Sequence, residues 1–552
     1  MKKLSLLNIL FLLFFSASVY AATAAAPTLP QVYITTTYSA PTGGTCNASN
    51  TAEFTACLAS AALDSTIVLT AGTTYIAPAD NGWVLPNKTT GSGWIYIISS
   101  NLANLPEGTR VGPSDASDMP KLEPYGSGAN RVFTTATSAH HFRLAGLEIR
   151  ADTGETNSAL MILGPEYDDD ADDTTIENNI TIDRCYVHGD ATVGSVRGIW
   201  FSVAYGAVID SYFTDFMSSG QDTQTIWAYE TPGPLKIVNN YLAATGENIM
   251  FGGTDNDAAD LIPQDIEIKR NHFIKPLAWK DAGWVVKNLL ESKMSLRVLV
   301  EGNIFENDWH EDQDTSINLK SEDQDGGGNN AWAETRDWTI RYNKIINVGN
   351  VIKFYPQGDN PGVDANTISF NNNLVIVNAT EQTSWAIYNH AVDNISIYNN
   401  TFVNANAAKR SIYMENYLGT GVGFDFLNNI IPIGAGMRAD GYVAGTASFA
   451  ALYPGGYLVE KNAIIRSGGD PGGYPANNFW PVDTAAIGFV NYTGDEDGNY
   501  RLASGSTYEN AGTDGKDLGA DIDALEAALA GEEDTPSTII KKIMNFFRRL
   551  RG

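Results

Sequence analysis

The chain has 552 residues and a formal charge of −29, because 64 acidic residues outnumber 35 basic ones. This acidity disfavours nucleic acid and anionic membranes as partners of the main body. The three cysteines exclude a cysteine-rich zinc site, and their spacing contains no redox Cys-x-x-Cys motif.

Residues 1–21 are predicted to be a signal peptide. Two lysines precede an apolar run from Leu4 to Phe15, and small residues follow it up to Ala21. The run is too short to cross a bilayer, and no later segment is long and apolar enough to do so. We therefore expect an exported protein, extracellular or periplasmic, with no transmembrane segment.

Residues 22–139 are expected to form an N-terminal cap and the first coils of a repetitive fold. The stretch from Glu53 to Ala62 predicts a short amphipathic helix that could cover the open end of that fold. Cys46 and Cys57 could form a disulfide in an oxidising compartment, with Cys185 left as a buried thiol. The sequence leaves this pairing open.

Residues 140–530 repeat a short phrase of alternating apolar residues, a polar pair ending in Asn, and a further apolar residue. The repeated Asn positions are Asn240, Asn271, Asn303, Asn343, Asn373, Asn400, Asn429 and Asn462, with Cys185 and Ser211 in the same place earlier. A period of about 30 residues containing short β-branched strands indicates a parallel β-helix of roughly ten or more coils. We expect each Asn to adopt the left-handed conformation and to stack its amide on the next coil, a structural role.

The periodicity fades after Asn462, and the stretch from Asn499 to Asp521 is predicted to be the closing coil. Residues 531–552 are predicted to be a polar linker followed by a basic amphipathic helix. That tail could contact an anionic membrane, a secretion partner or the protein's own acidic surface, and the sequence leaves these alternatives open. A monomer is expected.

A second strand in each coil places two columns of side chains on the outside of the predicted β-helix. The strands align on the apolar residues Ile199, Ile226, Ile249, Leu290, Ile317, Ile352, Ile387 and Ile412, which we expect to face inward. The first outward column is then Trp200, Trp227, Met250, Glu291, Asn318, Lys353, Tyr388 and Tyr413. The second is Ser202, Tyr229, Gly252, Lys293, Lys320, Tyr355, His390 and Glu415.

These columns predict a glycan-binding groove. Exposed aromatic rings suit stacking against sugars, and lysines between them suit carboxylates or sulfates. The expected substrate-binding residues are Trp200, Trp227, Tyr229, Glu291, Asn318, Lys353, Tyr388 and Tyr413. The alternative is that long loops, such as Ser321 to Thr335, fold over the strip and bury the rings.

The sequence also resembles a known family. The segment Thr66-Ile-Val-Leu with Gly72 and Tyr75, the stretch His141 to Ile149 and the coil phrases look like the pectate-lyase-like superfamily. Within it the chain is most like the alginate and chondroitin lyases of polysaccharide lyase family six. The resemblance implies an all-β, right-handed parallel β-helix with an N-terminal helical cap.

One local match implies a catalytic pair. Leu290-Glu291-Ser292-Lys293, followed by Lys320 on the next coil, resembles the family's order of a catalytic Lys and then an Arg. Lys293 would be the base and Lys320 the cation that neutralises a uronate carboxylate. Repulsion between the two would lower the pKa of one. Tyr355 or His390 could protonate the leaving oxygen.

The resemblance is incomplete at the metal site. Two Glu residues that bind calcium in the family correspond here to Val286 and Asn288. Glu291 could supply one ligand. The acidic loops could bind calcium elsewhere, and they contain Asp168, Asp169, Asp170, Asp172, Asp173, Asp308, Glu311, Asp312 and Asp314. Calcium stays unassigned, and no organic cofactor is expected.

The leading hypothesis is an exported lyase that cleaves an acidic, uronate-containing glycan by β-elimination. A non-catalytic glycan-binding or cell-surface β-helix is the main alternative. A hydrolase is ranked last, because it needs two facing carboxylates and only Glu291 and Glu415 stand in the columns, several coils apart.

Overall fold

A computed structural model describes most of the chain. The described residues are 23–166, 174–309, 311–360, 362–405, 408–416 and 419–530. The predicted signal peptide, the loop with Asp168 to Asp173 and the basic tail at 531–552 lie outside them. Among the described residues, no helix combines the length and the apolarity needed to cross a membrane.

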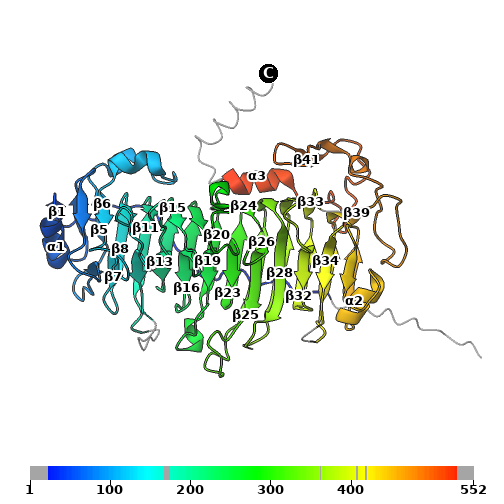
Figure 1. Cartoon of the computed structure of the whole chain (residues 1–552), viewed down its shortest axis with the longest axis horizontal. Helices are drawn as coiled ribbons and strands as arrows, with labels where there is room; N and C mark the ends of the chain where they lie inside the picture. Colours follow the sequence, from blue (N-terminus) through cyan, green and yellow to red (C-terminus); the bar gives the residue numbers. More distant parts are fainter. Residues whose placement is uncertain are drawn as a thin grey trace, which may run out of the picture.

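Three long parallel sheets run through the described residues and make a right-handed parallel β-helix (Figure 1). Sheet A contains β1 Thr45–Ala48, β2 Ser65–Leu69, β5 Ile95–Ser99, β8 His140–Ala145, β11 Asn178–Asp183, β14 Gly206–Ile209, β17 Leu235–Val238, β20 Gln264–Lys269, β23 Ser295–Glu301, β26 Thr335–Arg341, β29 Asn366–Asn371, β32 Asp393–Tyr398, β35 Phe424–Leu427 and β38 Tyr457–Glu460. Sheet B contains β3 Thr74–Ile76, β6 Lys121–Glu123, β9 Glu148–Arg150, β12 Tyr186–His188, β15 Tyr212–Phe216, β18 Tyr241–Ala244, β21 His272–Ile274, β24 Ile304–Asp308, β27 Lys344–Val348, β30 Leu374–Val377, β33 Thr401–Val403, β36 Ile430–Pro432 and β39 Ala463–Ile465. Sheet C contains β4 Trp83–Leu85, β7 Phe133–Thr135, β10 Met161–Leu163, β13 Arg197–Phe201, β16 Gln224–Ala228, β19 Glu247–Phe251, β22 Leu290–Ser292, β25 Thr315–Ser321, β28 Asn350–Gln357, β31 Trp385–Asn389, β34 Arg410–Met414 and β37 Met437–Ala439.

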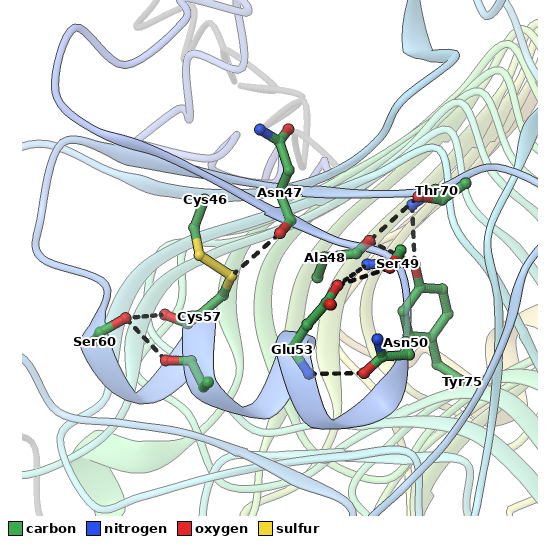
Figure 2. The surroundings of a disulfide bond; sticks show 11 residues. Cys46, Asn47, Ala48, Ser49, Asn50, Glu53, Cys57, Ser60, Thr70 and Tyr75 are labelled. Carbon is green, nitrogen blue, oxygen red and sulfur yellow. Dashed lines mark hydrogen bonds between the residues drawn. A yellow bond between two sulfur atoms is a disulfide. The ribbon is translucent and has the colours of Figure 1, made fainter.

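The N-terminal cap is the helix α1, Thr51–Ser60, which stands at the first coil (Figure 1). It begins two residues before the predicted Glu53, because the Asn50 side chain accepts from Glu53 N at 3.0 Å and caps the first turn. The Glu53 carboxylate in turn accepts from Ser49 N at 2.7 Å. Cys46 and Cys57 form a disulfide between β1 and this helix (Figure 2), and Cys185 is a buried free thiol.

The Asn ladder is present, and its hydrogen bonds are continuous from coil to coil. Asn303 N donates to Asn343 Oδ1 at 2.9 Å, and Asn303 Nδ2 donates to Ile268 O at 2.9 Å. The expectation that the ladder Asn itself adopts the left-handed conformation is wrong. The residue just before it does, with φ of 54° at Tyr342 and 52° at Asn372, which frees the ladder side chain to point inward.

An extended N-terminal segment, residues 23–42, runs along sheet A; we call it the N-terminal strap. Its hydrogen bonds join, in order, Ala24 to Asp425, Thr28 to Asp337, Gln31 to Asp265, Ile34 to Lys236 and Thr36 to Arg143. The partners lie on β35, β26, β20, β17 and β8. The strap therefore runs from the last coils back to the first, opposite to the direction in which the coils stack.

The C-terminal part departs from the predicted closing coil. β41, Asn499–Leu502, pairs antiparallel with β40, Phe489–Asn491, after the short helix α2, Thr446–Leu452, and the last coil strand. The chain then turns back over sheet B, and α3, Ile522–Ala530, lies across its strands (Figure 1). Ile522 and Leu525 pack against Ile346 and Leu374, so apolar burial holds this return segment.

Candidate active site

Sheet C carries the predicted columns in the expected register. Ile249 pairs with Leu290, Leu290 with Ile317 and Ile317 with Ile352, and all four side chains are fully buried. The first outward column follows the same pairing, from Trp200 to Tyr413. Each outward side chain thus has a neighbour on the adjacent coil.

A third outward column, two residues before the aligned apolar residue, was not predicted. It contains Arg197, Gln224, Glu247, Asn288, Thr315, Asn350, Trp385 and Arg410. Strict alternation would turn these residues inward. They face outward because two successive residues face the core, Leu289 with Leu290 and Val351 with Ile352. The Trp385 ring accordingly lies 4.8 Å from the outward Tyr388 ring.

The prediction of an exposed aromatic strip is wrong at its N-terminal end. Trp200, Trp227 and Tyr229 are buried, with exposed fractions of 4%, 2% and 1%. They pack with Ala333 and Trp332, which belong to the long loop that follows β25. The loop is anchored here because Trp332 Nε1 donates to Asn256 Oδ1 at 2.9 Å. These rings therefore contact the protein itself and do not form an open sugar-binding surface.

An open cleft of about 470 Å³ lies further along sheet C. It is lined by Asn288, Asp312, Gln313, Asp314, Thr315, Asn318, Lys320, Lys353, Trp385 and Tyr388. Two of the three lysines in the columns, Lys320 and Lys353, open into it, whereas Lys293 is not among the lining residues. The cleft thus combines two lysine side chains with the aromatic rings of Trp385 and Tyr388.

The two lysines predicted to be catalytic share one carboxylate. Glu322 Oε2 lies 2.8 Å from Lys320 Nζ and 3.2 Å from Lys293 Nζ, and Lys293 also contacts the Gln324 side chain. Burial alone would lower the pKa of Lys320, but Glu291 and Glu322 outweigh it and raise that pKa. The lowered pKa expected from repulsion within this pair is thus absent at Lys320, because Glu322 lies between the two ammonium groups.

The lysine with a lowered pKa is Lys353. Burial lowers it first, and the Lys320 ammonium on the neighbouring coil lowers it further. Lys353 Nζ lies 4.7 Å from the centroid of the Tyr355 ring and 5.6 Å from that of Tyr388. Within the described residues it makes no hydrogen bond or ion pair.

Tyr355 and His390, the two groups expected to donate a proton, lie beside Tyr388, which was expected to bind substrate. His390 is buried beside Tyr355 and Tyr388, and burial together with Lys353 lowers its pKa to about 3. The imidazole is therefore neutral near pH 7. Tyr388 donates to Glu415 Oε2 at 2.6 Å, and burial and this carboxylate raise the pKa of the phenol. Tyr413 donates to the other oxygen of Glu415.

Several buried oxygens on the outward side of sheet C have no hydrogen-bond donor among the described residues. They include Asn288 Oδ1, Glu291 Oε2 and Asn318 Oδ1. The Lys320 Nζ lies 4.0 Å from the other carboxylate oxygen of Glu291. Buried acceptors are costly when unpaired, so their partners come from solvent or from a bound molecule.

The side chains present do not fit the calcium site that the resemblance implies. Val286 stands at one of the two ligand positions and is fully buried in an apolar cluster with Met217 and Trp309. Among residues that the structure describes, no group of three or more His, Cys, Asp or Glu side chains is arranged to hold a metal. Asp312 and Asp314 instead accept hydrogen bonds from Val286 N and the Thr383 hydroxyl.

The stacked sheets, the ladder and the cleft define a right-handed parallel β-helix protein with lysines on one face. No protein-family model and no curated protein sequence matches the chain.

Similar solved structures include polysaccharide-active proteins. One is the family 6 alginate lyase AlyGC, with 12% identity and a TM-score of 0.47; the match covers 87% of this chain and 58% of AlyGC, so the chain spans less than two thirds of that protein. Another is pectate lyase Pel9A, with 14% identity, a TM-score of 0.37 and coverage of 84% and 90%. A third is the catalytic unit of the GH87 α-1,3-glucanase of Streptomyces thermodiastaticus strain HF3-3, with 11% identity, a TM-score of 0.43 and coverage of 79% and 67%.

Proposed function

We propose that this protein binds an acidic polysaccharide in the cleft on sheet C and cleaves it by β-elimination. The observation that carries the proposal is the position of Lys320 and Lys353, which line the same cleft beside the Trp385 and Tyr388 rings. Aromatic faces suit the apolar faces of sugar rings, and the Lys320 ammonium suits their carboxylates. In this proposal Trp385 and Tyr388 stack against the sugar rings, the role that the sequence predicted for Trp200 and Trp227.

Lys320 is the carboxylate-binding cation in this proposal. Removing the proton next to a uronate carboxylate builds negative charge on that carboxylate, so a fixed positive charge nearby lowers the barrier. Glu291 and Glu322 keep Lys320 protonated by raising its pKa. Because the expected calcium ligands are absent at Val286 and Asn288, Lys320 supplies this charge from the chain itself. The unpaired oxygens of Glu291 and Asn318 would accept hydrogen bonds from sugar hydroxyls.

The test is a panel of uronate polymers, namely alginate, pectate, dermatan sulfate and ulvan. Wild-type protein should release products with the ultraviolet absorbance of an unsaturated uronate on at least one of them. Lys320→Met should reduce kcat/KM by about 100-fold or more, whereas the matched change Lys344→Met on sheet B should leave it unchanged. A folded wild-type protein that yields no unsaturated product on any polymer contradicts the proposal.

A second candidate is a glycan-binding protein without catalysis. The observation that favours it is the shared carboxylate of Glu322, which holds both Lys293 and Lys320 in ion pairs. In that case an immobilised uronate polymer should retain the protein, Tyr388→Ala should weaken retention, and no unsaturated product should form.

We also propose that the protein is exported. The Cys46–Cys57 disulfide supports this location, because disulfides persist in oxidising compartments.

A further inference from the structure

We infer that Lys353, rather than Lys293, is the base that removes the proton next to the uronate carboxylate. This inference rests on the proposed function and assigns a residue role within it. It starts from position, because Lys353 lines the cleft on β28 while Lys293 does not line it.

The second step is the availability of the nitrogen lone pair. A base must reach substrate without first breaking strong contacts. Lys293 is held by Glu322 at 3.2 Å and by the Gln324 side chain, and Lys320 by Glu322 at 2.8 Å. In the described part of the chain, Lys353 makes no hydrogen bond or ion pair, and its Nζ lies over the faces of Tyr355 and Tyr388. These rings position the amine and leave its nitrogen open to the cleft.

The third step is protonation. An ordinary lysine is charged near pH 7 and cannot accept a proton. Burial and the Lys320 charge lower the pKa of Lys353 and outweigh the carboxylates of Glu291, Asp314 and Glu415, which raise it. The two tyrosine faces also oppose the lowering, because they favour the ammonium. The same lysine that binds the substrate carboxylate therefore favours the neutral form of the Lys353 amine.

Other groups at the cleft fit the role less well. The Tyr388 hydroxyl is committed to Glu415, which raises its pKa together with burial. His390 has a pKa of about 3 and does not line the cleft. The Asp314 carboxylate accepts a hydrogen bond from Thr383 at 2.8 Å.

The step balances without a co-reactant. The neutral Lys353 amine takes the proton from the carbon that bears the carboxylate, and the electron pair of that C–H bond becomes the new C=C bond. The C–O bond to the neighbouring sugar breaks, and its electron pair stays on the leaving oxygen. That oxygen takes the proton back from the Lys353 ammonium, which restores the neutral amine.

The experiment compares Lys353→Met, Lys353→Arg and Lys293→Met on the polymer that wild type cleaves best. We expect both Lys353 variants to lose about 100-fold or more in kcat, because Met has no base and Arg stays protonated. Their retention on the immobilised polymer should persist, most closely for Lys353→Arg. Lys293→Met should lose much less, and Lys344→Met serves as the unchanged control.

A pH profile provides a second readout. The rising limb of kcat/KM against pH should report the Lys353 pKa, and Lys320→Met should shift that limb to higher pH in its residual activity, because one repelling charge is gone. An active Lys353→Met, or loss of activity on Lys293→Met alone, overturns the inference while the proposed function stands. A wild-type protein that is inactive on every polymer overturns both.

Discussion

Glu230 is a buried carboxyl group whose protonation links stability to pH. It is 2% exposed and accepts a hydrogen bond from Asp257 N at 2.9 Å. Burial raises its pKa to about 7, and the Asp257 carboxylate adds to this effect against the hydrogen bond from Asp257 N. Because the folded protein holds this proton more tightly than the unfolded chain, the resulting stability is complete below the usual glutamate pKa. It is lost as the pH rises through about 7.

The substitution Glu230→Gln tests this linkage, because glutamine keeps the accepting oxygen and cannot ionise. We expect the free energy of unfolding to stay near wild type at about pH 5 and to rise at about pH 8, by on the order of 1 kcal/mol. Denaturant unfolding at the two pH values measures this, with the exposed Glu496→Gln as control. An equal change at both pH values would contradict the linkage.

The site was partly predictable at the residue scale. Lys320, Lys353, Asn318 and Tyr388 line the cleft, and period-two alternation from an apolar anchor is enough to find them. The outward position of Trp385 and Asn288 was not predicted. Two successive residues of each strand face the core, and this reverses the alternation for the residues that precede them. Glu322 was also missed, although it stands two residues after Lys320 and the same alternation would have placed it outward.

At the scale of elements, the Asn ladder is a continuous hydrogen-bonded column. Asn343 accepts from Asn303 N and Nδ2, both at 2.9 Å, and donates to Val300 O and Asn373 Oδ1, both at 3.0 Å. Removing this amide leaves several buried groups unpaired in the middle of the column.

Asn343→Ala should therefore lower the free energy of unfolding by about 2–4 kcal/mol. Thermal or denaturant unfolding measures the loss, and the exposed Asn491→Ala should change stability by less than about 0.5 kcal/mol. If the two variants are equally stable, the hydrogen bonds of Asn343 add nothing to the free energy of unfolding.

The strands were predictable at this scale, whereas the covering segments were not. Repeated apolar phrases mark sheets because each coil buries the same face. The loop over Trp200 and the return segment with α3 have no repeat, and their positions depend on single contacts such as Trp332 with Asn256. The prediction of a closing coil is wrong for this reason. Tyr500 is buried against sheet B together with Ile522 and does not continue the stack of coils.

At the scale of the whole molecule, the N-terminal strap joins coils that do not otherwise touch. Its backbone N–H groups donate to Asp265, Asp337 and Asp425, three carboxylates spread over many coils. Coils in a solenoid otherwise contact only their immediate neighbours, so stability is close to a sum of local terms. The strap adds a connection that acts along the whole length.

A variant lacking residues 23–36 should keep its β-sheet circular dichroism but unfold less cooperatively, with a lower midpoint, since a few kcal/mol of backbone hydrogen bonds are lost. Calorimetry can measure both quantities. Thr28→Pro removes only the donor to Asp337 and should give a smaller change in the same direction. A truncated protein with the wild-type transition would show that the strap merely rests on the surface.

The strap also reverses the order of synthesis and assembly. Residues 23–42 leave the ribosome before any coil, yet the Asp425 that receives Ala24 comes almost at the end of the repeats. This early segment is thus the last whose contacts can be completed. A chain that stalls in a middle coil lacks the strap's last partners, whereas in a finished chain hydrogen bonds hold the strap along sheet A. The full set of strap contacts therefore exists only in a chain whose coils are all folded.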